Sequence, residues 1–191
     1  GWHFLDSGAL YRLTALAVMK TRVPLADEVA LGEIAANLEI RFETKGSAVV
    51  SWLEGEDVSD RLRQEDTGVM ASKVAVIAAV RTALAQRQRR FRQPPGLVAD
   101  GRDMGTVIFP DAKLKIFLTA SAEIRAERRY KQLKEKGESV NLTPLFEEIK
   151  ARDLRDQSRS VAPLRPAEDA VIIDSTDLSI DEVFNKIVSL I

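Results

Sequence analysis

The sequence contains no cysteine and a single histidine, His3. The absence of cysteine excludes a disulfide framework and a cysteine-ligated zinc site, and it is typical of a protein kept in a reducing interior. His3 follows Trp2 in a predicted strand, so we interpret it as structural. The sequence therefore offers little support for a hydrolase with a Ser-His or Cys-His nucleophile, and we predict a cytoplasmic protein that is not such a hydrolase.

An excess of charge of one sign and a long apolar run are also missing. Lys and Arg number 28 against 29 for Asp and Glu, which gives no basic footprint for nucleic acid. No apolar stretch approaches the length that spans a bilayer. A length of 191 residues, 45% of them hydrophobic, predicts one main α/β domain with a small insert, and neither nucleic-acid nor membrane binding is expected.

A phosphate-binding loop of the Gly-x-x-x-x-Gly-Lys-Ser/Thr kind is a third absence, because no glycine in the sequence is followed by lysine. The sequence also starts at Gly1 without an initiator methionine. We expect a preceding strand and loop, within a unit of roughly 30 residues, to carry that motif.

Short apolar runs separated by helical patterns dominate the rest of the chain. The predicted buried strands are Trp2–Leu5, Leu97–Ala99, Leu114–Leu118 and Val171–Ile173. The first predicted helix begins after an N-cap Ser7, and a second runs from Val69 through Leu84 towards Pro94. A third extends from an N-cap Ser121 to Gly137, and a fourth has Pro144 in its first position. The last runs from Ile180 to Ile187. This alternation predicts a parallel sheet covered on both faces.

A different pattern interrupts the alternation. Leu38, Ile40 and Phe42 alternate with charged residues, and a turn at Lys45-Gly46 leads to a second run, Ala48–Leu53. The period of two predicts an antiparallel hairpin over residues 37–60, inserted between helices.

Asp100-Gly101-Arg102-Asp103 follows a predicted strand, where ligands of doubly wound sheets bind. The carboxylates of this segment suit a water bound to magnesium, and the arginine suits a phosphate, while the glycine lets the backbone turn. A polar turn with a structural Arg–Asp pair is the alternative reading.

Arginine recurs between Lys150 and Pro166, where Arg152, Asp156 and Arg159 are spaced to share one helix face. A solvated, salt-bridged face is the usual explanation, but the exclusive use of Arg favours phosphate oxygens, which match its bidentate fork. Arg81 lies within an apolar helical pattern, so it needs either a buried partner or a route to solvent.

Four segments, taken in order, resemble bacterial cytidylate kinases: Asp6–Arg12, Leu53–Ser59, Ala99–Val107 and Arg152–Arg159. The resemblance implies the α/β fold of nucleoside monophosphate kinases, a P-loop kinase-like parallel sheet core flanked by helices, with an inserted antiparallel hairpin subdomain and a helical lid. The implied boundaries are residues 1–31 and 74–191 for the core, about 124–150 for the lid and 32–73 for the monophosphate-binding insert.

Roles for individual residues follow from the same resemblance. Ser7 and Asp156 would hold the CMP ribose, and Tyr11 would line that pocket. Arg12, Arg102 and Arg159 would bind the phosphate, Arg152 would bridge to the transferred group, and Arg102, Arg152 and Arg159 would be catalytic. Ser72, Arg81 and Asp103 would read cytosine, with CMP preferred to UMP because uracil sets an oxygen against a carboxylate. Asp100 would hold Mg²⁺ through water, and Arg128 and Arg129 would be lid arginines at ATP.

The implied activity is phosphoryl transfer from ATP to CMP, and also to dCMP, by a monomer. In-line attack by the CMP phosphate on the γ-phosphorus would be assisted by arginines and by lid closure. Two alternatives stay open from the residues. One is a kinase of UMP, AMP or a sugar-like acceptor, and the other is a non-catalytic nucleotide-binding module, since the ATP loop is absent from the sequence.

Overall fold

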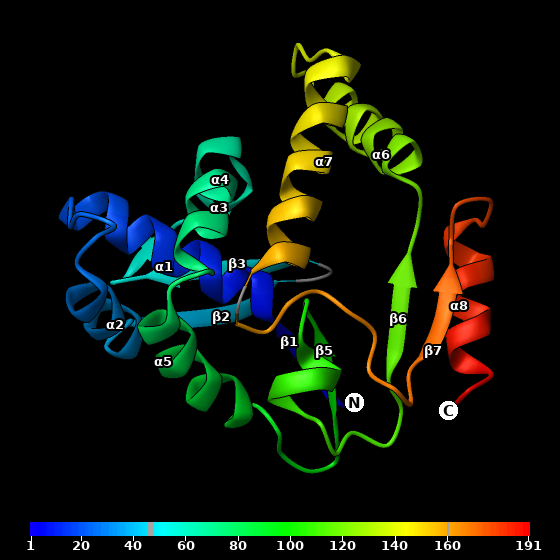
Figure 1. Ribbon diagram of the computed structural model, residues 1–191, viewed down its shortest axis with the longest axis horizontal. Helices are drawn as coiled ribbons and strands as arrows, with labels where there is room; N and C mark the ends of the chain where they lie inside the picture. Colours follow the sequence, from blue (N-terminus) through cyan, green and yellow to red (C-terminus); the bar gives the residue numbers. More distant parts are fainter. Residues whose placement is uncertain (46–47, 160) are drawn as a thin grey trace. The chain divides into compact units, whose positions relative to one another are not determined.

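A computed structural model of the chain describes residues 1–45, 48–159 and 161–191. The chain divides into two compact units, Gly1–Gly101 and Arg102–Ile191, and each is described by itself. Both combine parallel strands with helices, as Figure 1 shows in sequence colours. The predicted α/β class is confirmed.

A parallel pair of strands forms the sheet of the first unit. Strand β1 (His3–Asp6) pairs with β5 (Leu97–Asp100), in a register that sets Asp6 opposite Asp100 (Figure 1). Four longer helices accompany it: α1 (Ser7–Thr21), α2 (Glu28–Ala36), α4 (Glu65–Val74) and α5 (Ala78–Arg89). Leu13, Leu31, Val80 and Leu84 are fully buried in their shared core, so hydrophobic burial fixes the helices that carry the candidate site residues.

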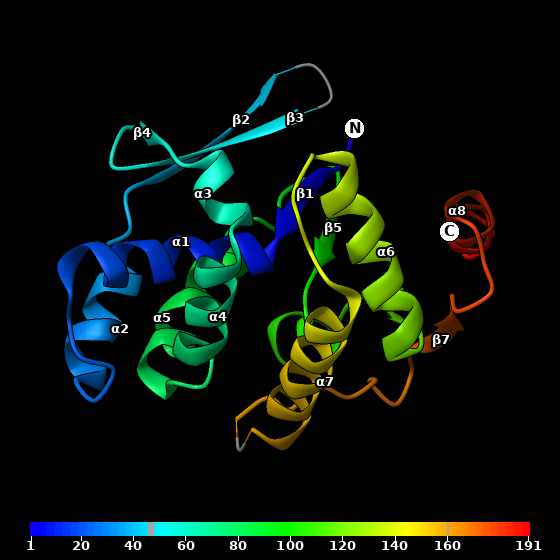
Figure 2. The same cartoon turned by 90° about the horizontal axis from the view of Figure 1, so that it is seen from above.

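The predicted hairpin is confirmed and gains a third strand. Strands β2 (Ile40–Lys45), β3 (Ala48–Leu53) and β4 (Glu56–Asp57) form an antiparallel sheet, with Ile40 opposite Leu53 (Figure 2). A short helix, α3 (Ser59–Arg63), follows and is tied to β3, because the Ser51 N–H donates to Ser59 Oγ at 3.0 Å. Of the predicted turn Lys45-Gly46, Gly46 lies outside the described residues.

Two details of the helix predictions in this unit are wrong. The cap of α1 is Asp6, whose carboxylate accepts from the Ala9 N–H at 3.0 Å, and Ser7 is the first helical residue. The single helix expected from Val69 to Leu84 is two helices, α4 and α5, bent by 101° at a break. Val74 and Ile77 are buried on either side of that break, so the apolar spacing continues although the helix does not.

The second unit also has a parallel pair of strands, β6 (Ile116–Thr119) and β7 (Val171–Asp174), with Ile116 opposite Val171. A one-turn π-helix, η1 (Met104–Ile108), follows Asp103. Helices α6 (Ala122–Glu135) and α7 (Leu142–Ser158) lie side by side, and α8 (Ile180–Val188) follows β7 (Figures 1 and 2).

Local signals in this unit are mostly confirmed. The Ser121 side chain accepts from the Ile124 N–H at 3.2 Å and caps α6, and Gly137 follows the helix end with φ +79. Helix α7 begins two residues before the predicted Pro144, after Asn141. Proline is tolerated there because the N–H groups of a first helical turn have no intrahelical acceptor. The lid and insert boundaries stay predictions.

Within the described ranges, no single helix is long and apolar enough to cross a membrane. Helices α4 and α5 together would be long and apolar enough, but a bend of 101° separates them.

Candidate active site

The first turns of α1 carry three of the predicted CMP ligands. Ser7 is 3% exposed, and Tyr11 lies one turn further on the same helix face. The Arg81 guanidinium, in the first turn of α5, lies 5.9 Å from the centre of the Tyr11 ring. Arg81 is 6% exposed and donates to the Ala75 carbonyl at 3.2 Å. The fold therefore brings Tyr11 and Arg81 together and holds this arginine inside the unit, so it does not extend to solvent.

Arg12 points towards the junction of α3 and α4. Its Nη1 donates to the carbonyl of Leu62 at 2.6 Å and to that of Gln64 at 3.3 Å. Leu62 lies in the last turn of α3, and Gln64 lies between α3 and α4, where it caps both helices. Ser72, the remaining predicted ligand of this unit, is half-buried on α4.

In the second unit, three arginines converge on one carboxylate. Arg102 Nε donates to Asp156 Oδ2 at 3.0 Å, Arg152 Nε lies 4.0 Å from the same oxygen, and Arg159 Nη1 lies 3.8 Å from Oδ1. The side chains of Asp156 and Arg159 are 11% and 5% exposed, while Arg102 and Arg152 keep 43% and 42%. Guanidinium groups gathered in this way suit the binding of an anion such as a phosphate.

Arg159 reaches this cluster in an unexpected way. Helix α7 ends at Ser158, and Arg159 has extended backbone with ψ 140. Its Nε donates to the Ala162 carbonyl at 2.6 Å, which turns the guanidinium back towards Asp156. The predicted helix face of Arg152, Asp156 and Arg159 is therefore corrected: the last of them lies just beyond the helix.

Asp103 and Asp100 differ in burial. Asp103 is 4% exposed and precedes η1, where its carbonyl accepts from Val107 at 2.9 Å and from Ile108 at 3.2 Å. Asp100 is exposed at the end of β5, opposite Asp6 in the register of the strands. Among the residues that the structure describes, no group of three or more His, Asp or Glu could hold a metal ion.

Arg128 and Arg129, the predicted lid arginines, have different partners. Arg128 donates to the Ser175 carbonyl at 2.6 Å and to the Leu178 carbonyl at 3.2 Å, so it ties α6 to the segment after β7. Arg129 donates to Gln132 on its own helix at 2.7 Å. In the same segment, the Thr176 hydroxyl and N–H donate to Asp174 and lower the pKa of that carboxyl.

Two ion pairs in the second unit escape prediction. Both guanidinium nitrogens of Arg125 on α6 donate to the carboxylate of Asp153 on α7. Lys115 donates to Asp169 at 2.8 Å and to the Pro110 carbonyl at 2.6 Å. The partners are 28 and 54 positions apart, and no local spacing links residues at such separations.

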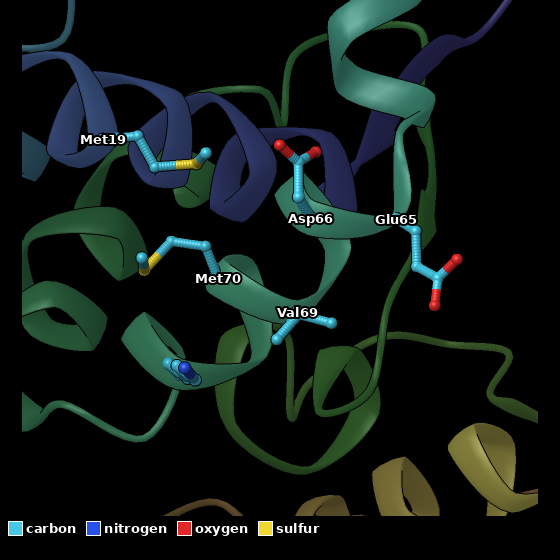
Figure 3. Close-up of a pocket in the computed structure, with 6 residues that line it drawn as sticks. Met19, Glu65, Asp66, Val69 and Met70 are labelled. Carbon is cyan, nitrogen blue, oxygen red and sulfur yellow. The ribbon is translucent and has the colours of Figure 1, made fainter.

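A cavity of about 450 Å³ lies in the first unit between α1 and α4 (Figure 3). Met19, Val69 and Met70 contribute apolar surface, and Glu65, Asp66 and Lys73 contribute charged side chains to its lining. None of the predicted site residues lines it. Two carboxylates against one ammonium group disfavour a phosphate there.

The chain is similar to known proteins over nearly its whole length. The family model for cytidylate kinase matches residues 1–191. The cytidylate kinase of Stutzerimonas stutzeri is 60% identical over 191 residues, which cover 99% of this chain and 83% of that protein. The cytidylate kinases of Aeromonas salmonicida and Pseudomonas fluorescens are 57% and 59% identical, each over 99% of this chain and 82% and 83% of their own lengths. The resemblance carried by the four segments is confirmed, and the chain belongs to the cytidylate kinase family.

Proposed function

We propose that the chain transfers a phosphoryl group from ATP to CMP, giving CDP and ADP, and that dCMP is a second acceptor. Family membership over the whole chain supports the reaction. The observation that carries the site assignment is the convergence of Arg102, Arg152 and Arg159 on Asp156. A monomer in the cytoplasm stays a prediction of the resemblance.

Phosphoryl transfer asks little covalent chemistry of the protein, so positioning and charge neutralisation provide the catalysis. Arg102 and Arg159 would bind the CMP phosphate, and Arg152 would stabilise the charge of the group in transfer. Asp156 pre-aligns these guanidinium groups, and its further lone pairs remain able to accept from a ribose hydroxyl. An alignment made before the substrate arrives costs no reorganisation during the reaction.

Arg12 and Ser7 of α1 would contribute to phosphate and ribose binding, with Tyr11 lining the same pocket. Arg12 is already fixed by two backbone carbonyls, so its guanidinium loses little conformational freedom when it binds a phosphate.

Ser72, Arg81 and Asp103 would read the base. The burial of Arg81 and Asp103, at 6% and 4% exposure, supports this assignment, because buried polar groups reject an analogue that leaves them unpaired or opposed. Asp103 would accept from the amine of cytosine, whereas uracil would bring a carbonyl oxygen against it.

Magnesium fits the strand ends of the first unit. Mg²⁺ keeps several waters and is bound through one or two carboxylates together with substrate phosphates. Asp100 is exposed at the end of β5, with Asp6 opposite it in the register, so Asp100 would hold the ion through water. The ion would neutralise phosphate charge during transfer, and Arg128 and Arg129 would serve the ATP side.

Calorimetric titration of CMP, UMP and AMP tests the proposal. We expect CMP to bind at least tenfold more tightly than UMP, since discrimination through buried hydrogen bonds is strong. Turnover with ATP and CMP should follow the same preference. Equal affinity for CMP and UMP would overturn the base assignment, and a preference for AMP would favour another acceptor.

A further inference from the structure

Gly68 lies directly against the guanidinium of Arg12. A Cβ built on Gly68 would lie 3.0 Å from Arg12 Nη2, 3.2 Å from Nη1 and 3.4 Å from Cζ. Carbon atoms keep larger distances from such groups in ordinary van der Waals contact. The missing side chain of Gly68 therefore leaves the space that the Arg12 guanidinium fills.

The backbone of Gly68 does not itself call for glycine. Its φ is outside the left-handed region, and its N–H donates to the Gln64 carbonyl at 3.1 Å, as in any regular first turn of a helix. Glycine is the poorest helix former after proline, so alanine would suit α4 better. The close approach of Arg12 is the feature of this position that requires glycine.

Hydrogen bonds also fix the Arg12 guanidinium. Nη1 donates to the Leu62 and Gln64 carbonyls at 2.6 and 3.3 Å. The Gln64 carbonyl also accepts from the Gly68 N–H, so one turn of backbone both receives the arginine and supplies the glycine beside it. A new methyl group at position 68 would push the guanidinium while the carbonyls hold it.

We propose that Gly68 is a positioning residue for CMP binding: it sets the place of the Arg12 guanidinium without touching the nucleotide. The inference rests on the proposed function, which takes Arg12 as a ligand of the CMP phosphate. A shift of a few tenths of an ångström spoils the alignment of a bidentate donor with phosphate oxygens. Weakening one charge-assisted hydrogen bond to the phosphate should raise the Kd for CMP about tenfold.

The test is calorimetric titration of CMP into wild type, Gly68→Ala, Gly68→Leu, Arg12→Met and the double variant Arg12→Met/Gly68→Ala, with urea unfolding of each. We expect Gly68→Ala to raise the Kd for CMP about tenfold and Gly68→Leu to raise it further. The urea midpoint of Gly68→Ala should stay at or above that of wild type. In the Arg12→Met background, Gly68→Ala should change the Kd no further.

Lys73→Ala is the control, since it makes a helix-favouring change at an exposed position of the same helix. It should leave the Kd for CMP unchanged. If Gly68→Ala lowers the urea midpoint, the double variant Gly68→Ala/Arg12→Lys is compared with the single variant Arg12→Lys instead. Lysine lacks the planar guanidinium group, so its side chain avoids the new methyl group. That double variant should bind CMP as Arg12→Lys does.

The outcomes separate the two ideas. Wild-type affinity in Gly68→Ala, or an undiminished effect of Gly68→Ala in the Arg12→Met background, would overturn the positioning role. Wild-type affinity in Arg12→Met would instead refute the assignment of Arg12 in the proposed function. Weak binding by Arg12→Met together with normal binding by Gly68→Ala would reject the positioning role alone.

Discussion

Arg102 donates its Nε–H to Asp156 at 3.0 Å, although 54 positions of sequence separate the two residues. Asp156 also lies 4.0 Å from Arg152 Nε and 3.8 Å from Arg159 Nη1. Its negative charge therefore offsets repulsion among three guanidinium groups at once. We therefore expect both the stability of the cluster and its proposed catalytic use to depend on this one side chain.

Replacing Asp156 by asparagine keeps the shape of the side chain and removes its charge. We expect Asp156→Asn to lower the free energy of unfolding by about 3 kcal/mol, the low end for breaking a buried ion pair, because two of the arginines are partly exposed. Urea unfolding measures the change, and sulfate should restore more stability to the variant than to wild type. A loss under about 0.5 kcal/mol, the range of ordinary surface changes, would contradict this view of Asp156.

Arg152 is expected to act on the rate more than on binding. Arg152→Met should lower turnover of CMP and ATP on the order of a thousandfold, judging from arginines that stabilise phosphoryl transfer in other enzymes. The Kd for CMP should change much less, because the proposed role of Arg152 lies in the transfer step. Arg155→Met, at an exposed position of the same helix, is the matched control and should keep turnover near wild type.

Asp103 is expected to determine the preference for cytosine over uracil. Asp103→Asn replaces an acceptor-only carboxylate by an amide that also donates. We therefore expect CMP to bind at least tenfold more weakly and UMP to bind as well as or better than it binds wild type. Parallel titrations of CMP and UMP measure the ratio of the two Kd values. An unchanged ratio would show that Asp103 does not contact the base.

The N-terminal cap of α6 is expected to contribute measurably to stability. Ser121→Ala removes the acceptor of the Ile124 N–H and should lower the free energy of unfolding by about 1 kcal/mol. Ser139→Ala, at an exposed position after the same helix, provides the control. Equal unfolding curves for the two variants would show that water replaces the cap at no cost.

Acid should weaken the fold through Asp169. The hydrogen bond from Lys115 is the largest cause that lowers the pKa of the Asp169 carboxyl. A carboxyl with a lowered pKa in the folded state stabilises the fold above its unfolded pKa of about 3.9, and that stability is lost as the pH falls through the folded value. Asp169→Asn should therefore flatten the fall in urea midpoint below about pH 4. Since the Asp169 side chain of this ion pair is exposed, 1 M salt should reduce the difference between the variant and wild type. Identical pH profiles of the two proteins would show that Asp169 does not contribute to the loss of stability in acid.

The sequence determined the elements whose signals are local. Alternation of Ile40 and Phe42 with charged residues predicts β2, and the cap at Ser121 predicts the start of α6, because period and capping act over a few residues. The same locality explains the errors. Apolar spacing across Ala75 to Ile77 is the same for one helix or two, and Asp6 and Ser7 are both good caps, so the sequence does not choose between them.

The four motifs determined the family, and they named Arg102, Arg152, Asp156 and Arg159 as charges to be explained. Only the tertiary structure decided which carboxylate they share, that Arg159 reaches it from beyond the end of α7, and that Arg12 fits against a glycine 56 positions away on another helix. The reason is physical: charge and hydrogen-bonding capacity belong to each residue, whereas distance and burial arise only when packing brings remote segments together.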